Sequence, residues 1–244
     1  MILRRVTLHF RNQEWTAIAL DFLIVVVGVF VGLQVSNWSE ERADSRREMM
    51  YLAALQEDFG SVIAELEGDI ARYEEIANSM TLLLDQSRKA EPDITLEQLN
   101  KAAGMLTAME GTPIVSDTYT NLTGSGDLAI IRSQAVKNAM SSFFSKAEVV
   151  NLVSNTHELQ LVNIFQPYII DNFDYTTTFK DRSLPMIIGL EPERILTVLP
   201  TLGFRNVVAV KWDAVTDIHG LLLSALVEAR AVEALLAEEL ESKQ

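Results

Sequence analysis

The sequence contains no cysteine and few of the residues that interrupt helices. Of its 244 residues, 11 are glycine and 6 are proline. The absence of cysteine excludes disulfide bonds, thiolate metal ligands and cysteine nucleophiles. The scarcity of glycine and proline disfavours a turn-rich β fold. Aromatic residues are also few, at 7%, so we expect an all-α protein whose core consists mainly of aliphatic side chains.

Positive charge is scarce as well. The chain has 20 lysine and arginine residues against 34 aspartate and glutamate residues, which gives a net charge of −14. Without residues 1–38, which hold three basic and two acidic residues, the remainder carries −15. A domain this acidic repels nucleic acid and anionic lipid surfaces, so we expect no nucleic-acid partner.

A long apolar run lies between Trp15 and Trp38. As a helix these 23 steps span roughly 34 Å, which matches a hydrocarbon core of about 30 Å with a tryptophan near each interface. No A-x-A-like cleavage site follows it, so we interpret the run as an uncleaved signal anchor. The predicted organisation is an amphipathic cytoplasmic tail (1–14), a transmembrane helix (15–38) and a soluble helical domain (39–244).

The orientation of the span is indicated by the basic residues before it. Arg4, Arg5 and Arg11 lie in the short N-terminal tail, which favours an N-terminus inside the cell under the positive-inside rule. The expected location is therefore the bacterial inner membrane, with the C-terminal domain in the periplasm. Arg42, Arg46 and Arg47 follow the span and weaken this asymmetry.

The span carries polar and small residues that favour contact with another helix. A carboxylate such as Asp21 is costly in lipid, so we expect it to hydrogen-bond a neighbouring helix; a proton-carrying role is the alternative. Gly28 and Gly32 form a G-x-x-x-G pair, which permits close helix approach. The predicted packing residues in the membrane are Asp21, Gly28, Gly32 and Gln34, and the predicted interface anchors are Trp15 and Trp38.

A long helix is predicted from Ser39 to a stop at Pro92. Its apolar residues recur every three or four positions, which is close to a heptad repeat, although Gly60 and Gly68 lie within it. The predicted core stripe is Leu52, Leu55, Phe59, Val62, Leu66, Ile70, Tyr73, Ala77, Met80 and Leu84.

Shorter elements are predicted in the middle of the chain. Thr95 and Gln98 form a capping box for a short helix, and Ser116 and Asp127 are predicted caps for two further short elements. A helix is expected from Gln134 to Pro167. A loop with a short extended piece is expected over 168–190, and a short helix over 191–199 with Pro192 in its first turn.

The final predicted helix has the most regular stripe. Its spacing alternates three and four residues along Val215, Ile218, Leu222, Ala225, Ala229, Val232 and Leu236. Two long stripes joined by shorter helices indicate an antiparallel, coiled-coil-like helical bundle. Either stripe is equally suited to pairing with a second copy of the chain, and the spacing does not decide between these arrangements.

The sequence offers no convincing catalytic, cofactor or metal site. The segment GSGDLA from Gly124 has the spacing of a dinucleotide-binding turn but lacks a preceding buried strand. His9, His157 and His219 are isolated, without the spacing of metal ligands. We therefore predict a protein that is not an enzyme and has no cofactor.

Two stretches resemble an uncharacterised family of bacterial single-pass membrane proteins. In that family an acidic residue opens a Val/Ile-rich span that ends in a Gln-x-x-Asn-Trp run, and a later element reads aromatic-x-x-Leu-x-x-Ser-Gly-x-Leu. The matching positions are Asp21, Gly28, Gln34, Asn37, Trp38 and Glu40, and then Tyr119, Leu122, Ser125, Gly126 and Leu128. The resemblance implies an inner-membrane protein with a helical domain and implies no activity.

The start of the span also resembles the flagellar stator B subunits, in which an Asp-Phe pair opens a single span and the aspartate carries protons. The matching residues are Asp21 and Phe22, but the remainder of the chain lacks the peptidoglycan-binding pattern of those proteins. Three functions are therefore open. The first is an accessory or scaffold subunit that binds a membrane-complex protein or a second copy. The others are a proton-coupled stator-like subunit and a ligand-binding sensor with a pocket around 111–133 and 168–190.

Overall fold

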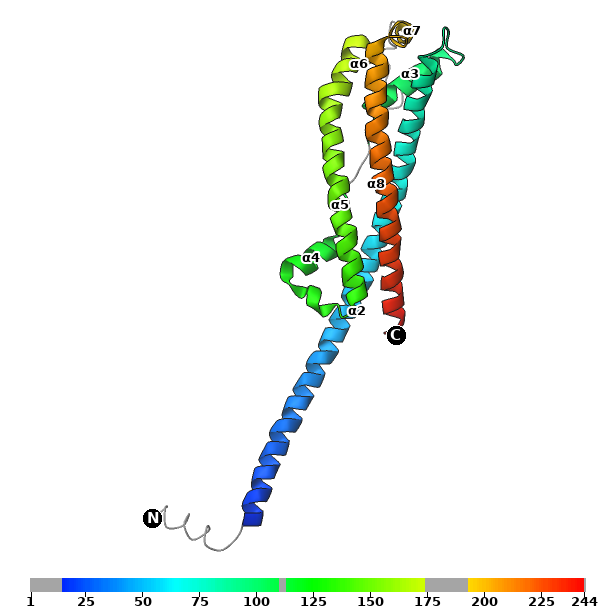
Figure 1. Ribbon diagram of the computed structural model, residues 1–244. Helices are drawn as coiled ribbons and strands as arrows, with labels where there is room; N and C mark the ends of the chain where they lie inside the picture. The colour runs from blue at the N-terminus through cyan, green and yellow to red at the C-terminus, as the bar shows by residue number, and fades with distance from the viewer. Residues whose placement is uncertain (1–14, 110–112, 174–192, 244) are drawn as a thin grey trace, which may run out of the picture. The chain divides into compact units, whose positions relative to one another are not determined.

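The computed structural model describes residues 15–109, 113–173 and 193–243, and every regular element in these ranges is helical (Figure 1). The elements are α2 (Trp15–Gln86), α3 (Leu96–Gly104), the 3-10 turn η1 (Met105–Thr107), α4 (Asp117–Ser125), the 3-10 turn η2 (Asp127–Ile130), α5 (Gln134–Gln160), the π-helical η3 (Leu161–Phe165), α6 (Gln166–Asn172), α7 (Arg194–Val198) and α8 (Leu202–Glu241). The predicted all-α class is confirmed. The predicted tail, 1–14, lies outside the described residues.

The chain divides into two compact units, Met1–Tyr51 and Leu52–Gln244. The described part of the first unit is the N-terminal half of α2. Its large apolar side chains between Leu20 and Trp38 are 45–71% exposed. Among the described residues, α2 is the one helix whose length and composition suffice to cross a membrane, and signal sequences meet the same criteria.

The second unit is a bundle of three long helical segments: residues 52–86 of α2, α5 and α8. Phe59 packs on Phe143, and Tyr73 lies beside His157. These pairs advance together along α2 and α5, so those two segments are parallel. Arg230 binds Glu67, whereas Trp212 binds Thr81, so α8 is antiparallel to α2. Figure 1 shows α5 and α8 side by side.

The core of the bundle follows a seven-residue repeat. In α8 the predicted stripe from Val215 to Leu236 is buried, and the same spacing continues upstream to Phe204. The additional core positions are Phe204, Val208 and Lys211. Interdigitation of such evenly spaced residues is the packing of coiled coils, so three helices share one continuous apolar interior.

The predicted stripe of α2 is correct in its first half and wrong in part of its second. Ile70, Ala77 and Leu84 are only half-buried, while Ile76 and Leu83 are fully buried. The observed positions preserve the seven-residue repeat, which places Asp69 near the core, whereas the predicted stripe departs from the repeat at Ile70. Gly60 and Gly68 do not interrupt the helix.

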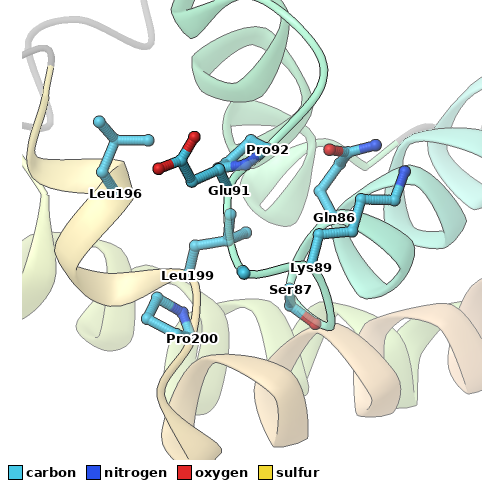
Figure 2. Close-up of a pocket in the computed structure, with 9 residues that line it drawn as sticks. Gln86, Ser87, Lys89, Glu91, Pro92, Leu196, Leu199 and Pro200 are labelled. Carbon is cyan, nitrogen blue, oxygen red and sulfur yellow. The ribbon is translucent and has the colours of Figure 1, made fainter.

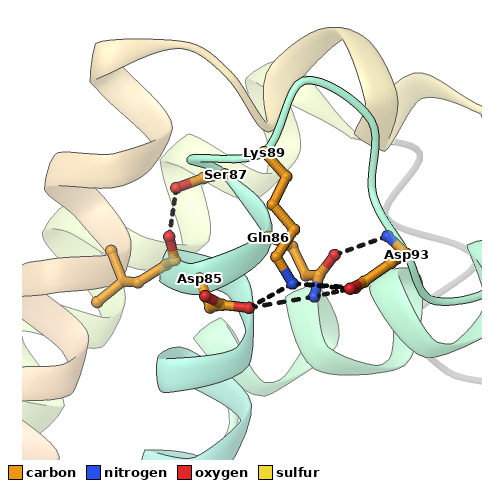
Figure 3. A network of polar contacts seen from close by, with 6 residues as sticks. Asp85, Gln86, Ser87, Lys89 and Asp93 are labelled. Carbon is orange, nitrogen blue, oxygen red and sulfur yellow. Dashed lines mark hydrogen bonds and ion pairs between the residues drawn. The ribbon is translucent and has the colours of Figure 1, made fainter.

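The connection from α2 to α5 begins with a turn held by polar contacts (Figure 3). Lys89 bridges Asp85 at 2.7 Å and Asp93 at 3.0 Å. The Gln86 amide donates to the Asp93 carboxylate, and the Asp93 backbone N–H donates back to Gln86 Oε1. The hydrogen bond that Lys89 donates to Asp85, followed by the one that it donates to Asp93, raises the pKa of Lys89. These contacts reverse the chain immediately before Thr95.

The predicted caps of the connecting helices are confirmed at Thr95 and Ser116. Thr95 forms a full capping box with Gln98, and the Ser116 hydroxyl accepts from the backbone of Tyr119. In addition, Asp58 of α2 accepts from the Ser116 hydroxyl at 2.5 Å and from the Thr118 backbone at 3.0 Å. A carboxylate at a helix N-terminus satisfies free backbone donors, so Asp58 fixes the start of α4 against α2.

Three local predictions are corrected. The cap of η2 is Gly126, in the left-handed conformation at φ +80°, rather than Asp127. The α5 helix does not stop at Pro167, because η3 widens it and Pro167 then lies in the first turn of α6. Residues 168–172 of the predicted loop are therefore helical.

The predicted helix over 191–199 is observed as the shorter α7, Arg194–Val198. Pro192, and residues 174–190 of the predicted loop, lie outside the described residues.

We expect Asp58→Ala to destabilise the second unit by about 1–3 kcal/mol, because the Ser116 hydroxyl and the Thr118 N–H lose a charged acceptor. Urea unfolding of the full chain in detergent, followed by circular dichroism, measures this change. Glu57→Ala, at an exposed neighbouring position, is the matched control. Equal stability of the two variants would contradict the assigned role of Asp58.

Candidate functional site

A lysine occupies a core position of the bundle. Lys211 lies in the heptad stripe of α8 and is 0% exposed. Its Nζ lies 2.7 Å from the carbonyl oxygen of Ala108, 3.1 Å from Nε2 of His157 and 4.8 Å from the centre of the Phe165 ring. An ammonium has three N–H donors and no acceptor, and here it faces two acceptors and an aromatic face.

Separate segments of the chain build this cluster. Ala108 follows η1, His157 lies near the end of α5, and Phe165 closes η3. The His157 ring is 2% exposed and lies edge-on to Phe165 at 6.1 Å and beside Tyr73 of α2 at 6.3 Å. The cluster therefore ties η1, α5, η3 and α8 together in the interior of one unit.

The lysine determines which nitrogen of His157 carries the proton. While Lys211 is an ammonium it only donates, so Nε2 then accepts with its lone pair and the ring proton lies on Nδ1. That Nδ1, and Oε1 of Gln160 one turn later, are buried without a partner among the described residues. Unsatisfied buried polar atoms cost free energy, so this end of the bundle is held less tightly than its apolar layers.

Burial governs the protonation of both groups. Loss of solvent lowers the pKa of Lys211 from 10.5 to about 7. For His157, burial and then the nearby Lys211 charge lower the pKa from 6.5 to about 4. The cation–π contact and the Ala108 carbonyl act in the opposite direction on Lys211, because both stabilise an ammonium.

The arrangement holds a proton in the core and offers little room for a substrate. Among the described residues, a pocket of about 210 Å³ lies elsewhere, between the end of α2 and α7 (Figure 2). Its lining includes the Lys89 turn together with Leu196, Leu199 and Pro200. Within the described residues, no cluster of three histidine, aspartate or glutamate side chains forms a metal site.

The residues predicted to pack in the membrane lie on an open helix surface. Asp21 and Gln34 are exposed, and a Cβ built on Gly28 or Gly32 meets no atom within 4 Å. Trp38 is 56% exposed, and the Arg42 guanidinium lies 3.9 Å above its ring. The side chain of Trp15 lies outside what the structure describes. The contacts predicted for these residues are with a neighbouring helix in the membrane, so their packing stays a prediction.

The second stretch of the family resemblance has a structural explanation. Tyr119 stacks on Phe144 at 4.0 Å, and Leu122 is fully buried. Ser125 accepts from the Asp127 backbone, and Gly126 supplies the left-handed cap. These residues join α4 and η2 to the base of α5 and α2. In the described residues around 113–133, buried Ile114, Leu122 and Ile131 fill the interior, so this part does not form the deep polar pocket of the sensor hypothesis.

No protein-family model, curated protein sequence or solved structure matches this chain.

We expect the free energy of unfolding to rise with pH in two ranges. Folded His157 binds fewer protons than the unfolded chain between pH 4 and 6.5, and Lys211 does so between pH 7 and 10.5, so stability increases with pH across each range. At about 1.4 kcal/mol per pKa unit, acidification through the histidine range removes about 3 kcal/mol.

Urea unfolding at a series of pH values measures both effects. His157→Gln should flatten the acidic range, and Lys211→Met the alkaline range. His219→Gln, a histidine outside the core stripe of α8, is the control and should leave the profile unchanged. A profile that is identical in all three variants would contradict this assignment of the two groups.

Proposed function

We propose that this chain is a non-enzymatic, single-pass inner-membrane protein that acts as an accessory or scaffold subunit of a membrane complex. The observation that carries the proposal is the exposed apolar half of α2, where large aliphatic side chains surround the helix on every side. A water-soluble protein rarely exposes so large an apolar surface, and a lipid environment covers it. The basic tail favours a periplasmic position for the bundle.

A second exposed apolar surface supports the scaffold role. Val149, Leu152 and Leu159 of α5 and Val162 of the following η3 are 47–67% exposed. We call these four residues the outer face of α5. The exposed carboxylates of Glu148 and Glu158 lie beside these positions, so a partner that binds here covers an apolar patch with an acidic border. The proposed occupant is a protein of the membrane complex, and a second copy is the alternative outcome.

The membrane anchor is tested by determining the cellular fraction and the intact mass of the mature protein. We expect the full chain to remain in the membrane pellet after alkaline carbonate extraction and to retain residues 1–38 by intact mass, because the apolar surface of α2 is stable only in lipid. A mature chain that begins beyond Asn37, or that is released to the aqueous fraction without detergent, would contradict the proposal.

The outer face of α5 is tested by cross-linking. Because the chain has no cysteine, a benzophenone attached to Thr156→Cys, an exposed position on the same helix, reports contacts at a single site in intact membranes. We expect a discrete adduct that is lost in Leu152→Glu/Leu159→Glu, because charge disfavours burial of this face. The mass of the adduct distinguishes a second copy from another subunit.

Two variants serve as controls for this experiment. Val227→Glu changes an equally exposed apolar residue on α8 and should preserve the adduct. Asp21→Asn should also preserve it in a scaffold protein, whereas loss of a proton-driven phenotype in this variant would support the stator-like alternative. Absence of any discrete adduct in the parent would count against docking through α5.

A further inference from the structure

The core spacing of α5 changes by one residue beside the buried lysine. Buried positions from Val136 to His157 follow the seven-residue repeat of the bundle. The next fully buried residue, Phe165, comes eight positions after His157 instead of seven. The π-helical η3 accounts for the difference, because a single π turn inserts one extra residue into a helix.

The sequence after the bulge provides apolar residues for two registers. In the observed register Phe165 and Ile169 are fully buried, while Ile164 is 38% exposed and Tyr168 is half-buried. In a continuous α-helix, Ile164 and Tyr168 would occupy the core positions instead, because they lie one residue earlier. The free energy of apolar burial therefore differs little between a helix with the bulge and a continuous α-helix.

Contacts specific to the observed register stabilise the bulge. Phe165 presents its ring to the Lys211 ammonium at 4.8 Å, a contact that the aliphatic Ile164 cannot replace. The Asn163 amide donates to the Leu159 carbonyl at 2.7 Å, and thereby satisfies a backbone acceptor at the widened turn. Pro167 has no N–H to donate to the preceding turn and lies near the start of α6.

We propose that the Lys211–His157 pair is a proton-sensitive device that sets the helix register of residues 161–172. A proton added to Nε2 of His157 removes an acceptor of Lys211 and places two cations 3.1 Å apart in the core. Lys211 then withdraws from the Phe165 ring, the bulge loses its specific contact, and Ile164 replaces Phe165 in the interior.

The surroundings of the pair leave this repulsion uncompensated. The neighbouring α2 contributes the Tyr73 ring, the segment after η1 contributes the carbonyl of Ala108, and η3 contributes Phe165. Among the described residues, Lys211 is the one charge that shifts the pKa of His157. Since burial holds that pKa near 4 and the pKa of Lys211 near 7, the bulged register persists while Lys211 is charged and His157 is neutral, and it converts in acid.

The register is measured by the accessibility of single cysteines. Ile164→Cys reports the bulge, because this position is exposed in the observed register and buried in the other. Leu159→Cys is the matched control, since it is 64% exposed and precedes η3 on the same helix. Both are introduced into the full chain in detergent and reacted with 4,4'-dithiodipyridine, which remains reactive toward thiols in acid.

The result is the ratio of the two reaction rates at neutral pH and near pH 4, the range in which His157 titrates. We expect the ratio of position 164 to position 159 to fall about tenfold or more in acid, while circular dichroism remains helical. In His157→Gln, whose amide still accepts from Lys211 but does not titrate, the ratio should stay at its neutral value.

A second variant keeps the inference testable if His157→Gln does not fold. Deletion of Val162 removes the extra residue, so Phe165 then follows the seven-residue repeat without a bulge and the ratio should not depend on pH. The inference is overturned if the parent ratio is unchanged near pH 4. An equal fall in the ratio for the parent and His157→Gln, or a general loss of helicity in acid, would also overturn it.

Discussion

The structure of the second unit depends on one repeat, the seven-residue spacing of buried residues in α2, α5 and α8. Each helix presents a narrow apolar stripe that is stable only against the stripes of the other two. The shorter elements are arranged around this requirement. Asp58 fixes α4 at one end of the bundle, and the Lys89 turn reverses the chain at the end of α2. Local polar contacts thus position segments, while apolar burial across the three helices supplies the stability.

One position of this repeat is informative because Lys211 places a cation there in the apolar interior. A lysine at a core position of a helical bundle lowers stability but specifies the arrangement of its neighbours. Lys211 selects the carbonyl of Ala108, the tautomer of His157 and the ring of Phe165. The π turn η3, which directly follows α5, lies at the same place. The interruption of regular helix packing at η3 therefore lies beside the titratable Lys211–His157 pair.

Periodicity in the sequence was sufficient to predict the long helices, but tertiary contacts decided the rest. The stripe of α8 was correct because its apolar residues are uninterrupted from Val215 onward. The register of α2 was lost at Asp69, where a polar residue occupies a position of the repeat. His157 is isolated in the sequence, and its partner lies 54 residues later. Extending the α8 stripe upstream by four residues would have placed Lys211 in the core, and this was the available signal.

The parallel arrangement of α2 and α5 has a consequence for the order in which the unit folds. The partners of α2 in α5, such as Phe143 for Phe59, are separated from it by the whole connecting region, whereas antiparallel α5 and α8 include nearer partners, such as His157 and Lys211, 54 residues apart. Contacts between distant parts of a chain form slowly, because closing the intervening loop costs entropy. During synthesis α2 emerges before both of its partners, so its apolar stripe is fully covered only after α8 has also left the ribosome.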